Sequence, residues 1–287
     1  MGTMAGRTPR RWIAPPRWTG AITDYFDRRV DRVAGSPEKA VAMTDAWVAK
    51  AQKRYGSDSW KTVNTVEAAA KRRDAAGDHS GALGLRLQVL AKRRSHLGPE
   101  HRQTLSAEYA LAGTLLGLDE PEQARPYADH ALESYMVELG PDDPVTLAAL
   151  ERSARIQLQL GETTEGIFKY RRAVAGFRSL GDEVRAERVT VNLGRLLLLR
   201  GELVDALDVF RELVDVQGLR LGPDDPATLA SLRDLALTLA RLGRLREAKV
   251  VAQNLVDAMT RVHGPDHAST TDASQLLDRI EASLPSE

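Results

Sequence analysis

Residues able to do catalytic or metal chemistry are scattered through this chain of 287 residues, and their spacing assembles no reactive set. The absence of cysteine excludes thiolate catalysis, a disulfide framework and a cysteine metal site. The sequence also lacks a Gly-x-Ser-x-Gly nucleophile elbow, a phosphate-binding glycine loop and a His-Glu-x-x-His motif. His263 and His267 are near neighbours, but the intervening Gly264-Pro265 predicts a turn rather than a shared helix face. We therefore expect no enzyme, no metal site and no cofactor.

Two pairs of adjacent aspartates, Asp142-Asp143 and Asp224-Asp225, are the other candidates for acid/base chemistry or cation binding. Each pair is followed at once by a proline and then by an apolar stretch. Aspartate before the first turn of a helix caps its free N–H groups and favours the positive end of the helix dipole. Proline is well suited to the first helical position. We interpret both pairs as the starts of helices.

Both pairs belong to a phrase, Leu-Gly-Pro-Asp-Asp-Pro-x-Thr-Leu, that returns in stronger or weaker copies about every 42 residues. A fixed period of this size is typical of a solenoid of stacked supersecondary units. Residues 222–263 illustrate one unit, in which Gly222 ends the preceding helix and two apolar stripes with helical spacing are separated by Gly243. The glycine of the phrase stands at Gly56, Gly98, Gly140, Gly181, Gly222 and Gly264.

Small residues recur in the same register and indicate close approach of paired helices, because a larger side chain there would clash with the partner. In the expected second helix they are Ala40, Ala82, Ala124, Gly166, Ala206 and Ala248. In the expected first helix they are Ala70, Ala112, Ala154, Gly194 and Ala236.

The small residues, the Gly243…Glu247-Ala248 turn and the Leu-Gly-Pro-Asp phrase resemble the tetratricopeptide repeat (TPR), and the repeat length resembles the kinesin-light-chain type. The resemblance covers roughly residues 18–287. It implies an all-α fold, an α-solenoid whose antiparallel helix pairs stack into a right-handed superhelix of about six units. We place the units at 18–55 (degenerate), 56–97, 98–139, 140–180, 181–221 and 222–263, with a capping helix within 264–287 whose Leu276, Leu277 and Ile280 face inward.

Composition limits the partners and the compartment. Lys plus Arg and Asp plus Glu both number 40, so the net charge of zero makes nucleic acid an unfavourable partner. No apolar run is long enough for a membrane span, and we expect a cytoplasmic protein without a membrane partner. The abundant alanine and arginine are typical of a GC-rich bacterium. Residues 1–17 form a basic tail with proline, arginine and tryptophan, which we interpret as a loosely docked arm, with partner binding and nucleic-acid binding as alternatives.

In the tetratricopeptide family the first helix of each unit lines the concave groove, and the small residue of that helix sets which positions point inward. The positions rich in cations suit an extended acidic peptide, because guanidinium groups bind carboxylates in bidentate fashion. The alternative is that these arginines pair with neighbouring acids such as Glu151 and Asp234 and merely solvate the groove. The candidate peptide-binding residues are Lys71, Tyr109, Arg152, Arg155, Arg188, Asn192, Arg195, Arg233 and Arg241.

Three functions remain open at this point. The first is a non-catalytic scaffold or adaptor that binds an acidic or aromatic-acidic segment of another protein in its groove. The second is a sensor that closes around a peptide or small ligand and signals through a partner effector. The third is a self-assembling structural subunit, a homo-oligomer formed through the N-terminal unit, where Trp12, Trp18 and Trp47 gather.

Overall fold

The computed structural model describes residues 35–284, so the tail predicted for residues 1–17 and the start of unit 18–55 lie outside the described residues. The described chain contains twelve α-helices and no strand, which confirms the all-α solenoid. The helices are α2 (Pro37–Tyr55), α3 (Trp60–Ala75), α4 (His79–Leu97), α5 (Arg102–Gly117), α6 (Pro121–Glu138), α7 (Pro144–Gln159), α8 (Thr163–Ser179), α9 (Glu183–Arg200), α10 (Leu203–Arg220), α11 (Pro226–Arg241), α12 (Leu245–His263) and α13 (Ala268–Ala282).

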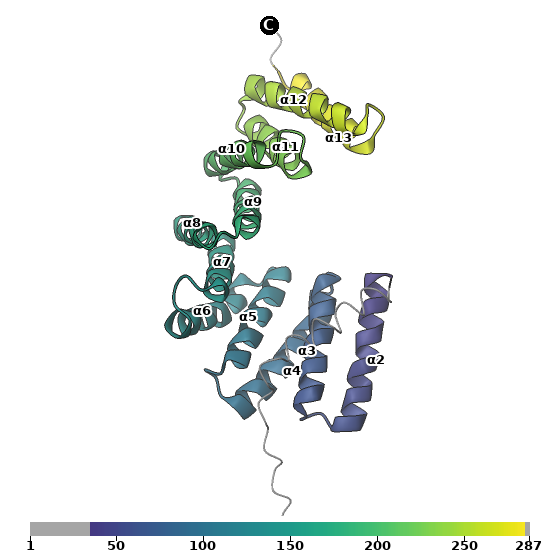
Figure 1. Ribbon diagram of the computed structural model, residues 1–287, viewed down its shortest axis with the longest axis vertical. Helices are drawn as coiled ribbons and strands as arrows, with labels where there is room; N and C mark the ends of the chain where they lie inside the picture. The colour runs from purple at the N-terminus through teal and green to yellow at the C-terminus, as the bar shows by residue number, and fades with distance from the viewer. Residues whose placement is uncertain (1–34, 285–287) are drawn as a thin grey trace, which may run out of the picture. The chain divides into compact units, whose positions relative to one another are not determined.

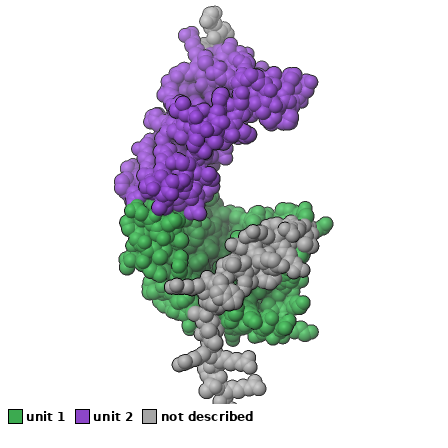
Figure 2. All heavy atoms as spheres, viewed as in Figure 1, with its two compact units in different colours: residues 1–156 green, residues 157–287 purple. Residues whose placement is uncertain are grey.

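The chain divides into two compact units, Met1–Ile156 (unit 1) and Gln157–Glu287 (unit 2), which are coloured separately in Figure 2. Within each unit a helix packs mainly on its neighbours in sequence, from α2 to α6 in unit 1 and from α8 to α13 in unit 2 (Figure 1). We call α3, α5, α7, α9 and α11 the first helices of their repeats, and α4, α6, α8, α10 and α12 the second helices. None of the described helices combines the length and apolarity needed to cross a lipid bilayer.

The aspartates cap helices as predicted. The Asp225 carboxylate accepts a hydrogen bond from the Ala227 N–H at 2.8 Å, and Pro226 is the first residue of α11. At the equivalent positions of α5 and α13 the cap is a histidine, whose Nδ1 faces a backbone N–H at 3.2 Å in both helices (His101 and His267). At these two helix starts an imidazole nitrogen therefore caps the helix in place of a carboxylate oxygen.

The recurring threonine of the phrase joins the two ends of the turn between repeats. In α11 the buried Thr228 hydroxyl donates to the Gly222 carbonyl at 2.9 Å, and the same bond, six residues apart in sequence, recurs at Thr62, Thr104 and Thr270. The glycines at these turns have φ between 80° and 99°. At Gly56, Gly98 and Gly264 ψ is between 160° and 165°, so the backbone lies in a region almost restricted to glycine.

The small residues lie at the tightest helix contacts. Ala70, Ala112, Ala154 and Ala236 of the first helices are fully buried. A Cβ placed on Gly194 of α9 would lie 2.8 Å from Cζ of the buried Phe210 ring of α10. The recurring small residues therefore occupy positions where a larger side chain would clash, as the sequence pattern predicted.

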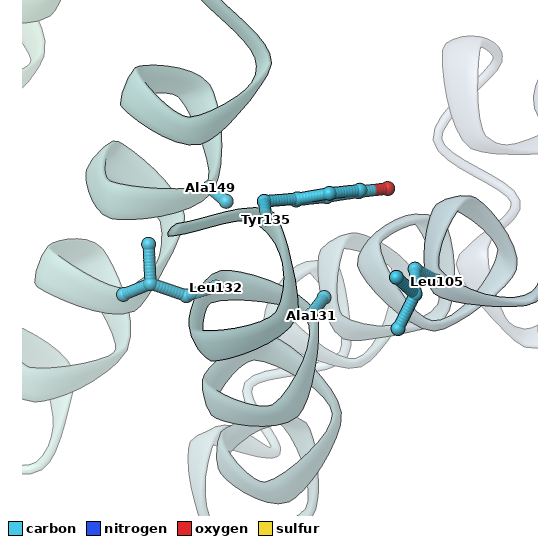
Figure 3. Packing of buried hydrophobic residues seen from close by; sticks show 5 residues of the cluster. All are labelled: Leu105, Ala131, Leu132, Tyr135 and Ala149. Atoms are coloured by element: carbon cyan, nitrogen blue, oxygen red, sulfur yellow. The ribbon is translucent and has the colours of Figure 1, made fainter. Parts of the chain in front are cut away.

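Apolar side chains from successive helices form the core. In unit 1, Tyr135 and Leu132 of α6 lie between Leu105 of α5 and Ala149 of α7 (Figure 3). Burial raises the pKa of the Tyr135 hydroxyl to about 12. In α13, Leu276 and Ile280 are buried, as expected of a capping helix, while the next residue after Leu276, Leu277, is only half-buried.

Candidate functional site

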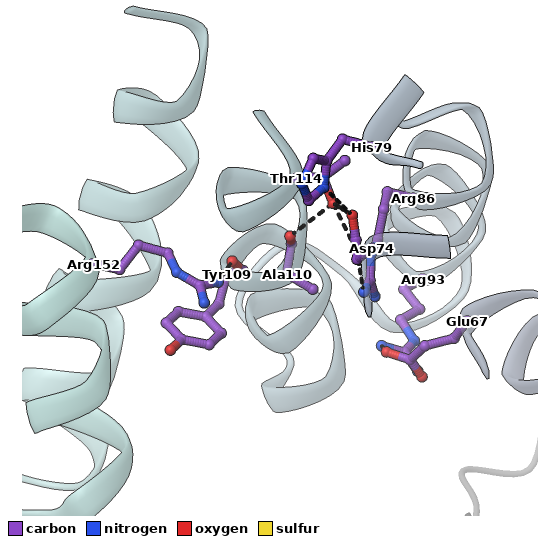
Figure 4. Close-up of polar contacts among 9 residues, drawn as sticks. All are labelled: Glu67, Asp74, His79, Arg86, Arg93, Tyr109, Ala110, Thr114 and Arg152. Carbon is purple, nitrogen blue, oxygen red and sulfur yellow. Dashed lines mark hydrogen bonds and ion pairs between the residues drawn. The ribbon is translucent and has the colours of Figure 1, made fainter. Parts of the chain in front are cut away.

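In unit 1 the carboxylate of Asp74, near the end of α3, is surrounded by donors (Figure 4). Arg86 of α4 donates to it from Nε at 3.1 Å and from Nη2 at 2.8 Å, the Thr114 hydroxyl of α5 donates at 3.0 Å, and Nδ1 of His79 lies 3.2 Å away. A Cβ on Gly117 of α5 would lie 2.6 Å from the His79 ring. This end of the α5 face is therefore filled by the protein's own side chains.

A second buried arginine satisfies the other inward-facing acid of α3. Arg93 of α4 forms a fork with Glu67, with nitrogen–oxygen distances of 2.9 and 2.5 Å, and also donates to the Gln103 carbonyl at 3.0 Å. Two hydrogen bonds to one carboxylate are the geometry in which a buried ion pair best offsets its desolvation. Glu67 and Asp74 thus hold α3 to α4 rather than offering charge to a ligand.

The next predicted residues of unit 1 are two arginines of α7, Arg152 and Arg155, and Tyr109 of α5. The guanidinium of Arg152 reaches from α7 to α5, where its carbon lies 3.6 Å from the centroid of the Tyr109 ring and Nη1 donates to the Tyr109 carbonyl (Figure 4). Gly113 makes room for it, because a Cβ there would lie 2.8 Å from Nη1. Desolvation lowers the pKa of Arg152. Attraction to Tyr109 and then to the carboxylate of Glu151 opposes this lowering of the Arg152 pKa, and Arg155 is exposed.

In unit 2 the predicted cations of α9 and α11 lie together, and one buried acid serves two of them. Nε of Arg195 donates to Asp234 at 2.8 Å, while Arg233 lies 3.6 Å from the other oxygen of the same carboxylate. Nη1 of Arg241 donates to the Leu198 carbonyl at 2.6 Å. Arg195 and Arg233 still expose about half of their side chains, 48% and 57%. The arrangement leaves excess positive charge on this face.

The remaining predicted residues lie on α3 and α9. Lys71 and Arg188 are exposed, and Asn192 is half-buried. Near the end of α9, Leu198 is buried in the core, whereas Leu199 is 78% exposed. Leu237 of α11, 39% exposed, adds a second apolar surface among the arginines of unit 2.

Sequence reasoning missed the buried arginines Arg86 and Arg93. Both occupy inward positions of α4 at which α6 has Ala128 and Tyr135. An arginine that replaces a buried apolar residue in a repeat is a signal of a buried ion pair, since its charge needs a partner.

A further polar network was also missed. The fully buried Glu108 of α5 accepts two bonds from Arg94, at 3.2 and 2.7 Å, and lies 2.6 Å from Nδ1 of His130. Nε2 of His130 lies 3.1 Å from Glu100 in the turn between repeats. The bond to Glu108 and then that to Glu100 raise the pKa of His130, while desolvation opposes them. This network joins α4, α5 and α6 through Arg94, Glu108 and His130.

The tetratricopeptide repeat family matches residues 103–179 and 185–253, which together make up just over half of the sequence. The chain belongs to the tetratricopeptide repeat family. Among curated proteins none matches it significantly.

Solved structures extend the similarity to the kinesin-light-chain type of TPR. The nearly identical TPR-like repeats assigned to a kinesin light chain of Podosopora anserina are 20% identical, with a TM-score of 0.62 over 70% of this chain and 96% of that one. BtubC (BKLC) of P. vanneervenii is 17% identical, with a TM-score of 0.54 over 90% of this chain and 94% of that one. A Rap protein in complex with competence and sporulation factor is 15% identical, with a TM-score of 0.53 over 90% of this chain and 74% of that one. The fold is that of an interaction scaffold.

Proposed function

We propose that this TPR protein is a non-catalytic scaffold that binds an extended acidic segment of a partner protein along its first helices. The observation that carries the proposal is the charge of unit 2's first-helix face. Arg195 of α9 and Arg233 and Arg241 of α11 supply this charge, and within the described part of the chain Asp234 is the only carboxylate that pairs with any of the three. One buried carboxylate cannot neutralise three guanidinium groups, so an acidic ligand gains attraction here while the Arg195–Asp234 pair stays in place.

The chemistry of the ligand follows from the apolar surface among these cations. Leu199 and Leu237 are exposed on the same helices as the arginines. A segment that alternates carboxylates with aliphatic or aromatic side chains matches both features, because the anchors bury apolar area while the acids meet guanidinium groups. In unit 1 the stacked Arg152 and Tyr109 add a positive charge and an aromatic ring, which suits the same ligand chemistry.

A fold-level comparison supports peptide binding in general terms. The Rap protein, a neighbour in fold, was crystallised with its competence and sporulation factor. At 15% identity this similarity concerns the architecture alone, and the choice of an acidic segment rests on the arginines of this chain.

The test is fluorescence anisotropy with a labelled peptide of alternating glutamate and leucine, compared with a peptide in which lysine replaces glutamate. We expect the acidic peptide alone to bind, and its affinity to fall as salt rises from low to physiological concentration. Arg233→Gln and Arg195→Gln should weaken binding. Arg246→Gln, which removes an exposed arginine from the second helix α12, is the matched control and should leave affinity unchanged. Equal loss in all three variants, or binding indifferent to salt, would contradict the proposal.

A further inference from the structure

Unit 2 has a cavity on its second-helix side that the proposed peptide-binding function does not use. It lies between α8 and α10, with α9 beneath it, and its volume is about 440 Å³. These three helices follow one another in the chain and pack in sequence (Figure 1). A volume of a few hundred Å³ with a mainly apolar lining is typical of small-ligand sites.

The floor of the cavity is apolar and ordered by the core. Val174 of α8, Leu193 of α9 and Val209 of α10 are each less than 10% exposed and contribute to the lining. The Thr190 hydroxyl also lines the cavity, and it donates to the Ala186 carbonyl at 2.8 Å, which leaves its oxygen able to accept a hydrogen bond. An aliphatic or aromatic side chain of a ligand would bury its surface against this floor.

The walls carry opposite charges on opposite helices. Arg171 stands on α8 and Asp208 on α10, both are exposed, and neither forms an ion pair with any other described residue. A molecule that carries a carboxylate and an ammonium group on one carbon atom presents the matching pair of charges to these two walls.

A salt bridge between the same two helices favours a small ligand over a docked partner helix. Both terminal nitrogens of Arg178 on α8 lie 3.1 Å from Glu212 on α10, and both residues line the cavity. The pair spans the gap between α8 and α10, so a partner helix lying along the gap would have to break it. A small molecule would not need to break it.

We propose that this cavity, the α8–α10 cavity, binds a free α-amino acid with an apolar side chain. The carboxylate of the amino acid pairs with Arg171, its ammonium group pairs with Asp208, and its side chain rests on Leu193 and Val209. This site is independent of the first-helix faces, so either proposal can fail without the other.

The test is isothermal titration calorimetry of the full chain with L-leucine, L-isoleucine, L-valine, L-methionine and L-phenylalanine. The best of these ligands is then compared with its two single-charge analogues, the carboxylic acid without the ammonium group and the amine without the carboxylate. For leucine these are 4-methylpentanoate and 3-methylbutylamine. We expect each analogue to bind roughly tenfold more weakly or worse, because one wall charge then has no partner.

Two charge-removing variants and one filling variant complete the experiment. Arg171→Gln and Asp208→Asn should each weaken binding about tenfold, which is the effect of losing one charged contact. Ala175→Phe, at an exposed cavity position, should abolish binding while circular dichroism stays unchanged. Asp215→Asn, an exposed site on α10 outside the lining, is the control and should bind normally. Absence of binding by all five amino acids, equal binding of the analogues, or normal binding by all three cavity variants would overturn the proposal.

Discussion

The hydrogen bond from Thr228 to the Gly222 carbonyl yields a sharp prediction, because α11 contains a second threonine that serves as a matched control. Both Thr228 and Thr238 are buried, at 2% and 0% exposure. The Thr228 hydroxyl donates to the Gly222 carbonyl in the turn. The Asp225 N–H also points at this carbonyl, but from a longer distance of 3.4 Å. The Thr238 hydroxyl bonds the Asp234 carbonyl four residues earlier at 2.7 Å, within the helix. Only the first bond serves an acceptor that has no other good donor.

The magnitudes follow from what each substitution by valine leaves behind. Thr228→Val keeps the shape of the side chain but leaves the Gly222 carbonyl without a close donor. Gly222 is only partly buried, and a net hydrogen bond is worth about 1 kcal/mol, so we expect a loss of about 1 kcal/mol. The helix ladder still satisfies the Asp234 carbonyl in Thr238→Val, so we expect a change within about 0.5 kcal/mol.

The assay is urea unfolding followed by far-UV circular dichroism, with hydrogen exchange at the amides of α11. Hydrogen exchange is needed because repeat arrays often unfold in parts, and a global midpoint then understates a local effect. Thr228→Val should lower the midpoint and the protection of α11, with an unchanged denaturant slope. A loss in Thr228→Val no greater than that in Thr238→Val would refute the role assigned to the turn.

Further predictions concern the backbone, the core and the histidine network. Gly98→Ala should destabilise the protein by about 1–3 kcal/mol in thermal melts, because φ is 88° and ψ is 165° at this residue. Gly84→Ala, inside α4 with open space around it, is the control and should stabilise the protein by up to about 1 kcal/mol. Gly194→Val should cost about 1–3 kcal/mol in urea, since its methyl groups would meet a buried phenylalanine ring at less than contact distance, and an unchanged midpoint would contradict the packing. The raised pKa of His130 beside Glu108 means that the folded state binds this proton more tightly, so the stabilisation is fully present below the ordinary value of 6.5 and is lost as pH rises through the raised pKa. The stability difference between the wild type and His130→Gln, measured by urea unfolding across this range, should therefore shrink with rising pH, and a pH-independent difference would exclude the linkage.

Much of the fold was predictable because the repeat constrains the same positions several times over. The small residues predicted to lie at helix contacts are buried, and Gly194 faces Phe210 closely enough to exclude a side chain. The aspartate caps were predictable because aspartate is favoured at the residue before the first turn of a helix. The histidine caps at His101 and His267 were not, because histidine has no general preference for that position and only the alignment of the repeats reveals the substitution.

The candidate site was less predictable, since a register tells which face a residue occupies and not what it pairs with. On α3, for example, Glu67 and Asp74 pair with Arg93 and Arg86, which come from the second helix α4. The arginines of α9 and α11 remain candidates for peptide binding, with Asp234 shared between two of them. Whether a cation faces a ligand or a neighbouring acid depends on side-chain reach between repeats, which the spacing of one sequence does not encode.

The packing of each described helix mainly on its neighbours in sequence has a consequence for folding during synthesis. Nearly all stabilising contacts join residues within two helices of each other, so the entropy of closing long loops is a small part of the barrier to folding. During synthesis each newly emerged helix finds the surface that it needs already present on the helix before it. The surface of α12 in turn is covered only when α13 has followed it out of the ribosome.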